Sequence, residues 1–288
     1  MAVLAVQAIR RMRGGAQSQL MRGADGALWV VKFRNNPQGE RVLANEFLAT
    51  RIAEAVGLTV PQTEVIEVSE WLVAHSPELW VEGPRGERVR CEAGLQFGSR
   101  FAGGLMPGQV VDYLPEGQLE ELRNLREFVG MLAVDKLCGN CNGRQAVFER
   151  KARERKYRAR FIDQGFCFNA GEWTFPDAPL RGVYPRNCVY AWVTGWESFE
   201  PWLSRLEALP AEVLGAAAEQ IPPGWYGGDP ALLERLLEQI LERRAGIRAL
   251  ISAFRASARE PFPRWGEVTK DSLPGLADEY DETVRMVM

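Results

Sequence analysis

The apolar positions of the first hundred residues alternate over short stretches that glycine and proline interrupt. This pattern predicts β-strands at 3–12, 20–23, 27–33, 64–68 and 95–101. Ala24-Asp25-Gly26 marks a tight hairpin turn between two of them, and the first strand reads as an edge strand. Residues 42–56 instead carry apolar side chains at helical spacing, and Gly57 supplies a stop. The first part of the chain is therefore expected to be a sheet with one amphipathic helix.

Beyond residue 110 the apolar period lengthens to that of helices. Helices are expected at 119–137, 189–202, 203–220 and 230–254, with strands at 145–149 and 157–161. Segments 71–91 and 171–187 read as loops. The pattern predicts an α+β protein with two lobes. We expect an N-terminal lobe at 1–110 that combines strands with one helix, a mostly helical lobe at 111–265, and an acidic tail at 266–288.

Composition narrows the class of protein. The chain is 46% hydrophobic and 25% charged, as is usual for soluble globular proteins. A net charge of −3 argues against a general nucleic-acid binder, and no apolar run is long enough to cross a bilayer. The positive charge near the N-terminus follows the short apolar run, which is the wrong order for a secretory signal. We expect a cytoplasmic protein that binds neither membrane nor nucleic acid directly.

Cysteine and histidine offer little chemistry. Five scattered cysteines indicate reduced thiols, and the Cys138–Cys141 pair closes a helix instead of opening one, unlike a redox motif. No second cysteine pair lies at zinc spacing. The single histidine, His75, precedes Ser76 and reads as an exposed loop residue.

Three charged side chains stand in unusual surroundings. Lys32 lies in a strand that otherwise reads as buried, and Asp163 lies in the apolar run 161–168, just before Gly165. A lone buried charge is costly, so each is expected to meet an opposite charge. Glu46, on the second turn of the first helix, is a candidate partner for Lys32. Two alternatives without a functional role stay open. Lys32 can lie on an edge strand with its ammonium in water, and Glu46 can be an ordinary solvated acid.

Two further segments carry weaker signals. The turn Gly14-Gly15-Ala16-Gln17-Ser18 provides backbone N–H groups that suit a phosphate, although it lacks the lysine and the helix of a P-loop. Taken alone, this segment is read first as a plain hairpin turn. The basic run 150–156 is expected to be a solvated hairpin tip, with a contact to a partner or a phosphate as the alternative.

In order along the chain, these pieces match what phosphoryl transfer requires. The sequence resembles the HipA-like kinases, a family of bacterial proteins with a protein-kinase-like fold. The resemblance is carried by Gly14-Gly-Ala-Gln-Ser-Gln19, Val30-Val-Lys-Phe-Arg-Asn-Asn-Pro37, Asn45-Glu46, Val56-Gly-Leu-Thr-Val-Pro61, Asp135-Lys136, Gly139-Asn-x-Asn-Gly-Arg-Gln145 and Ile162-Asp-Gln-Gly165. It implies a two-lobed, protein-kinase-like fold, in which 1–110 is the nucleotide-clamping lobe and 111–265 carries a catalytic-type loop. It also implies ATP and Mg²⁺ between the two lobes, with Lys32 on the phosphates, Glu46 orienting Lys32 and Asp163 on the metal.

The candidate site follows from this resemblance. The candidate cofactor-binding residues are Gly14, Gly15, Ala16, Gln17, Ser18, Lys32, Glu46 and Phe97. The candidate metal ligands are Asp163 and Gln145, and the candidate catalytic residues are Asn142, Asp163 and Lys32.

The chain departs from the family at the catalytic loop, where the family has Asp as base and Asn five residues later as second metal ligand. With Phe148 setting the register, these positions hold Asn142 and Val147. An amide does not accept a proton as a carboxylate does, and valine does not bind metal. A register shifted by two puts Asn140 and Gln145 in the two roles.

Four functions therefore stay open. They are an ATP-dependent kinase acting on a protein Ser or Thr hydroxyl, a pseudokinase that binds nucleotide without turnover, an enzyme that transfers AMP, and a scaffold that binds no nucleotide. The first is preferred, with an unknown protein as partner. A scaffold predicts that Lys32 and Asp163 lie far apart.

Overall fold

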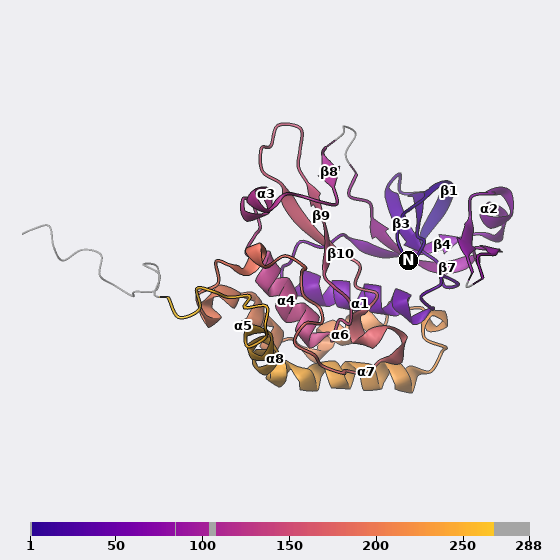
Figure 1. The fold of residues 1–288 in the computed structure, drawn as a ribbon. Helices are drawn as coiled ribbons and strands as arrows, with labels where there is room; N and C mark the ends of the chain where they lie inside the picture. Colours follow the sequence, from indigo (N-terminus) through magenta and orange to yellow (C-terminus); the bar gives the residue numbers. More distant parts are fainter. Residues whose placement is uncertain (1, 84, 104–107, 268–288) are drawn as a thin grey trace, which may run out of the picture.

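The computed structural model describes residues 2–83, 85–103 and 108–267. Most of the expected acidic tail, residues 268–288, lies outside these ranges, as do Gly104 and Pro107. Within them the molecule combines strands and helices, as the changing apolar period predicts (Figure 1).

Five strands of the first hundred residues form one closed sheet. They are β1 (Val3–Arg11), β2 (Gln19–Gly23), β3 (Leu28–Lys32), β7 (Gly94–Arg100) and β4 (Thr63–Val68), in this spatial order. β1 pairs antiparallel with β2 and parallel with β4, which closes the sheet. The prediction that β1 is an edge strand is therefore wrong, because both of its sides are paired.

Side chains that alternate along these strands fill the interior of the closed sheet. Met21, Trp29, Val31 and Ile66 are buried there together. Between Trp29 and Val31, Val30 points to the other face of β3 and lines a cavity. The same alternation decides the surroundings of Lys32, the last residue of this strand.

Helix α1 (Arg41–Ala55) lies between the closed sheet and the C-terminal helices (Figure 1). It contacts β7 on one side and α6 (Ala211–Ala218) on the other. A single apolar face was expected, but α1 is buried on most sides because it has neighbours on both. Buried polar side chains such as Asn45 and Glu46 must then find partners within the protein.

The remaining helices are shorter and more interrupted than predicted. They are α2 (Glu70–His75), α3 (Glu116–Glu120), α4 (Glu127–Leu137), α5 (Trp202–Glu207), α7 (Pro230–Arg243) and α8 (Ile247–Arg255). 3₁₀ turns occur at η1 (Cys167–Glu172), η2 (Asn187–Tyr190), η3 (Trp196–Phe199), η4 (Pro223–Trp225) and η5 (Arg244–Gly246).

Several predicted helices need correction. The predicted helix 119–137 is two helices with a break between Glu121 and Arg126. The predicted helix 189–202 is wrong, because only the turns η2 and η3 form before Pro201. Pro210 divides 203–220, since proline lacks the N–H that a continuing helix would use. The predicted helix 230–254 is divided into α7 and α8 at η5.

Segment 71–91, expected to be a loop, contains α2 and the hairpin of β5 (Trp80–Glu82) and β6 (Arg88–Arg90). His75 is exposed, as predicted, but it is the last residue of α2 and does not lie in a loop.

A second sheet of three strands stands beside the closed one (Figure 1). It orders β10 (Arg158–Ile162), β9 (Gln145–Glu149) and β8 (Val110–Val111). One face of β9 and β10 buries Ala146, Phe148, Ala159 and Phe161 against the helices. The opposite face is left to line cavities, and Asp163 follows directly after β10.

All five cysteines are free, with Cys138 and Cys167 fully buried. Among the residues that the structure describes, no helix is both long and apolar enough to span a bilayer.

Replacing Gly130 by alanine is expected to lower the free energy of unfolding by about 1–2 kcal/mol. Gly130 lies on α4, where an added methyl would come within 2.5 Å of the Trp202 ring. This overpacking outweighs the ~1 kcal/mol that alanine gains over glycine in helix propensity. Urea unfolding measures the difference.

The matched control is Gly117→Ala in α3, where the added methyl meets nothing within 4 Å. That variant is expected to be at least as stable as the wild type. A Gly130→Ala protein as stable as the control would contradict the close approach of α4 and α5.

Candidate functional site

The site centres on Lys32, whose ammonium lies between two carboxylates. Its Nζ donates to Glu46 Oε1 and, at 2.7 Å, to Asp163 Oδ1. Lys32 ends β3, Glu46 comes from α1 and Asp163 follows β10, so three distant segments meet here. All three residues line a cavity of about 820 Å³.

Burial and charge shift the pKa values of all three groups. Burial lowers the pKa of Lys32, but attraction to Glu46 and Asp163 outweighs this and the net shift is upward. At Asp163 burial favours a higher pKa, whereas the charge and hydrogen bond of Lys32 bring the pKa below its ordinary value. Burial raises the pKa of Glu46 despite the opposing charge of Lys32. The ammonium therefore stays charged at neutral pH and stabilises both carboxylates.

Two adjacent residues of α1 hold the segment that carries Asp163. Glu46 Oε2 accepts from the Gln164 backbone N–H at 3.0 Å. Asn45 Nδ2 donates to the carbonyls of Gly165 at 2.9 Å and Ala170 at 2.7 Å. Gly165 permits this proximity, because a Cβ there would lie 2.5 Å from a methyl of Val42.

Asp163 itself adopts a left-handed backbone conformation, with φ of 65°. Residues other than glycine rarely do so, and such strain is usually maintained by surrounding contacts at functional sites. Both oxygens of this carboxylate have partners: Lys32 on Oδ1, and Gln145 Nε2 at 2.7 Å from Oδ2. Asp163 is the point where the β3, α1, β9 and β10 segments converge.

The glycine-rich turn between β1 and β2 borders the same cavity. Gly14, Gly15, Ala16 and Ser18 line it, and the φ of 122° at Gly14 is accessible to glycine alone without strain. Gln17 differs from its neighbours. Its side chain donates to the Glu82 carbonyl at 3.1 Å and is not among the lining residues, so the structure turns it toward β5.

The cavity also has apolar lining residues. They are Phe97, which is buried at the centre of β7, and Val111, Val147 and Ile162. A cavity lined by apolar side chains as well as by glycine N–H groups and a lysine suits a ligand with an aromatic and an anionic part.

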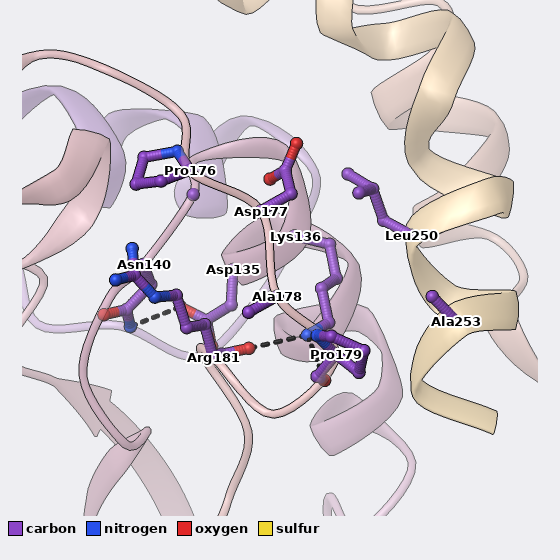
Figure 2. Close-up of a pocket in the computed structure, with 11 residues that line it drawn as sticks. Asp135, Lys136, Asn140, Pro176, Asp177, Ala178, Pro179, Arg181, Leu250 and Ala253 are labelled. Atoms are coloured by element: carbon purple, nitrogen blue, oxygen red, sulfur yellow. Dashed lines mark hydrogen bonds between the residues drawn. The ribbon is translucent and has the colours of Figure 1, made fainter. Parts of the chain in front are cut away.

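The loop between α4 and β9 is held by a buried ion pair. Arg144 donates through Nε to Asp135 Oδ2 at 2.8 Å and through Nη1 to the Ile162 carbonyl at 2.7 Å. Asn140 Nδ2 donates to Asp135 Oδ1 at 2.8 Å (Figure 2). Asp135 and the amide of Asn140 are thereby committed to holding the loop. Because Arg144 also binds the end of β10, the loop and Asp163 are positioned together.

Lys136, the next residue of α4, supports the following segment. Its Nζ donates to the carbonyls of Pro179 at 2.8 Å and Arg181 at 2.6 Å (Figure 2). Burial lowers the pKa of Lys136 to about 8, against the opposing charges of Asp135 and Asp177. The cavity beside it, about 80 Å³, is far too small for a nucleotide.

The structure thus brings together Lys32, Glu46, Asp163, Gln145, Phe97, Gly14, Gly15, Ala16 and Ser18 around one cavity. It does not bring Asn142 there: this side chain is exposed, accepts from the Gly143 N–H at 2.8 Å and is not among the lining residues. Val147, by contrast, lines the cavity. Asn45 and Arg144 had no assigned role in the sequence, where they appear only as parts of motifs.

Residues 5–108 match the family model described as HipA-like kinase. The resemblance seen in the sequence is confirmed over this part of the chain. No curated protein matches the chain by sequence.

Solved structures extend the likeness beyond residue 108 at the level of fold. The proinflammatory kinase CtkA of Helicobacter pylori is 13% identical with a TM-score of 0.53, covering 88% of this chain and 97% of that one. Hydra Fam20, solved with sugar, is 11% identical with a TM-score of 0.53, covering 91% and 89%. The Golgi casein kinase is 13% identical with a TM-score of 0.52, covering 89% and 74%. The mixed α+β fold is therefore kinase-like.

Replacing Lys32 by methionine is expected to lower the free energy of unfolding by about 3–5 kcal/mol at pH 8, because the buried carboxylate of Glu46 and the half-buried one of Asp163 lose their cation. The folded pKa of Glu46 is already raised, and it rises further without Lys32. The folded variant then binds more protons than the unfolded chain, so its stability increases as pH falls. Urea unfolding at pH 8, 7 and 5 should show the deficit shrinking.

The matched control is Arg264→Met, which breaks an exposed ion pair with Glu267. Little change is expected there at any pH. A deficit in the Lys32→Met protein that stays constant from pH 8 to pH 5 would show that lost packing, and not charge, is responsible.

Proposed function

We propose that the chain is a kinase that binds ATP with Mg²⁺ in the cavity at Lys32 and transfers the γ-phosphoryl group to a Ser or Thr hydroxyl of a protein. The observation that carries the proposal is the contact of one lysine with both Glu46 and Asp163 at the wall of an 820 Å³ cavity. Protein kinases require these parts: a strand lysine, its helix glutamate and a metal-binding aspartate.

In this proposal the protein has two lobes that meet at the cavity. Residues 1–110 form the clamping lobe, with the closed sheet and α1, and 111–265 form the mostly helical lobe. The base lies against the apolar side chains of Phe97, Val147 and Ile162, and the triphosphate lies between Lys32 and the turn at Gly14. The backbone N–H groups of that turn and the ammonium then offset phosphate charge.

The oxygen donors at Asp163 fit a magnesium ion. Mg²⁺ prefers carboxylate and amide oxygens and keeps several waters. Asp163 supplies the carboxylate, and Gln145 supplies its Oε1 when the side-chain amide turns about its terminal bond. Such a metal ion neutralises the charge that develops on the phosphates. Gln145 thus takes the place of the asparagine that is missing at Val147.

The chain's own residues would act mainly by positioning. Glu46 fixes the direction of the Lys32 ammonium, and Asn45 and Glu46 fix the backbone that carries Asp163. Arg144 holds the loop between α4 and β9 in place by binding Asp135. Positioning and electrostatic stabilisation account for most of phosphoryl-transfer catalysis, so turnover does not require a carboxylate base.

A pseudokinase is the second candidate, and one observation favours it. Among the described residues that line the cavity, the carboxylates are Glu46, Asp112 and Asp163. Glu46 is bound by Lys32 and Gln164, and Asp163 by Lys32 and Gln145. The family's base position holds Asn142, which is neutral. Nucleotide binding is therefore expected in both candidates, and turnover in the first alone.

ATP with Mg²⁺ is expected to stabilise the wild-type protein by about 2.7 kcal/mol at a concentration of 100 Kd. Asp163→Asn is expected to abolish the part of this gain that depends on Mg²⁺, because an amide binds the ion far more weakly than a carboxylate. Thermal unfolding with ATP, with ATP plus EDTA, and without nucleotide measures both effects.

Glu267→Gln, an exposed change remote from the cavity, serves as the control and should keep the full gain. If ATP fails to stabilise the wild type at any concentration, the proposed function is wrong. If ATP stabilises the protein but γ-labelled ATP transfers no label, the pseudokinase is the correct candidate.

If Asn142 meets the acceptor hydroxyl outside the nucleotide cavity, as the family's base would, Asn142→Asp is expected to increase self-labelling by γ-labelled ATP about 100-fold, within the usual contribution of a general base. The side chain is exposed and nearly isosteric, so the melting temperature should not change. Lys32→Ala provides the background of the assay.

Gln220→Glu makes the same amide-to-carboxylate change at an exposed position after α6 and should leave labelling unchanged. If the rate is the same in Asn142→Asp and in the wild type, Asn142 does not occupy the position of the base.

A further inference from the structure

A second cavity of about 600 Å³ adjoins the nucleotide cavity. Val110 of β8 and Arg160 of β10 line both. The second cavity lies toward the tip of the β9–β10 hairpin, away from Asp163. Its function is not explained by binding of ATP, because Lys32, Asp163 and the turn at Gly14 do not reach it.

Strand alternation explains how the two cavities come to share one surface. Ile162 pairs with Gln145, Arg160 with Val147 and Arg158 with Glu149. These six side chains lie on the face of the hairpin opposite to the buried one. With a rise of about 3.3 Å per residue, Arg160 lies roughly 10 Å and Arg158 roughly 16 Å from Asp163 along the strand. The surface therefore changes from apolar to basic with distance from the site.

Basic side chains dominate this second cavity, which we call the basic groove. Its cationic residues are Arg123, Arg150, Lys151, Arg158 and Arg160. Its acidic residues are Glu149 and Glu154, and each is already paired. Arg160 binds Glu149 and Arg123 binds Glu154, both at 2.5 Å. Within the described ranges no ion pair within 4 Å involves Arg150, Lys151 or Arg158, so three positive charges are left.

The hydrogen-bonding capacity of the groove is also incompletely used. The Nε–H of Arg160 is buried and has no acceptor among the described residues. Among the described residues, the side chain of Arg158 finds one acceptor, the Thr59 hydroxyl at 3.4 Å. Arg150 stacks over the Tyr157 ring at 4.6 Å, which fixes its guanidinium without neutralising it. Guanidinium groups held in this way are suited to carboxylates.

We propose that the basic groove docks an acidic segment of the protein that this chain phosphorylates, an inference that rests on the proposed function. Carboxylate side chains of the segment bind Arg158, Lys151 and Arg150. The distance from Asp163 separates docking from phosphoryl transfer. The groove therefore sets the affinity for the substrate and leaves the chemical step unchanged.

The observations favour an acidic peptide over a nucleic acid. A nucleic acid is held by many phosphate contacts along an extended basic track, whereas three spare cations in a 600 Å³ groove match a few carboxylates. The net charge of −3 also opposes a long polyanion.

The test uses the full chain and a fluorescein-labelled decaglutamate peptide, without nucleotide, with fluorescence polarisation as the readout. We expect the wild type to bind this peptide and not a decalysine peptide. Reversing two charges, Lys151→Glu with Arg158→Glu, is expected to weaken binding at least about tenfold. Thermal stabilisation by ATP should be the same in variant and wild type.

The matched control is Arg153→Glu with Arg155→Glu. Both residues are exposed in the same hairpin tip, lie outside the groove and undergo the same change of charge. Binding within about twofold of wild type is expected for this pair. The neutral pair Lys151→Gln with Arg158→Gln should fall between the two.

Three results would overturn the inference: no binding of decaglutamate by the wild type, equal losses in the groove pair and the control pair, or tighter binding of a single-stranded RNA of equal charge. Because the assay contains no nucleotide, its outcome is independent of ATP binding. If the protein binds the peptide but is not stabilised by ATP, the docking role of the basic groove stands and the proposed kinase function is wrong.

Discussion

The ammonium of Lys32 between Glu46 and Asp163 is the interaction on which the rest of the structure depends. Glu46 is buried and Asp163 half-buried, where a carboxylate alone would be unfavourable, and each belongs to a different part of the chain. The closed sheet supplies the cation, α1 supplies one anion, and the segment after β10 supplies the other. No two of these segments can shift apart without leaving a buried charge unpaired.

Helix α1 converts this local interaction into a constraint on the whole cavity. Asn45 and Glu46 are neighbours in sequence, and both bind backbone of the 163–170 segment. Arg144 binds the same region from the opposite direction through the Ile162 carbonyl. The conformation of Asp163, with its positive φ, is thus determined from two sides before any ligand enters. Preorganisation of this kind is what charge stabilisation in a phosphoryl-transfer site requires.

Much of this arrangement was predictable from the sequence, for a simple physical reason. A buried lysine or aspartate stands out in an apolar strand, so Lys32 and Asp163 are visible by their surroundings. Residues Leu43 to Val56 keep helical spacing, and α1 forms close to the predicted bounds.

The errors arise where long-range contacts decide. Aromatic and aliphatic residues between 189 and 202 suit a helix, but they pack as two short turns whose large side chains fill the core. The side chain of Gln17 turns toward Glu82 of β5. The sequence around Gln17 gives no indication that this strand lies nearby. Arg144 and Asp135 are nine positions apart, and nothing in their spacing shows that they form a buried pair. Likewise, the cations of the basic groove come from three segments that only the fold brings together.

The closure of the five-stranded sheet has a consequence for assembly. An open sheet exposes a row of unpaired backbone groups, to which a strand of another molecule can add. In this sheet β1 is paired on both sides, so that kind of recruitment is blocked at its strands. A protein that binds this region must therefore recognise its side chains, which differ from one sequence to another. It cannot bind by pairing with the backbone of a free strand edge.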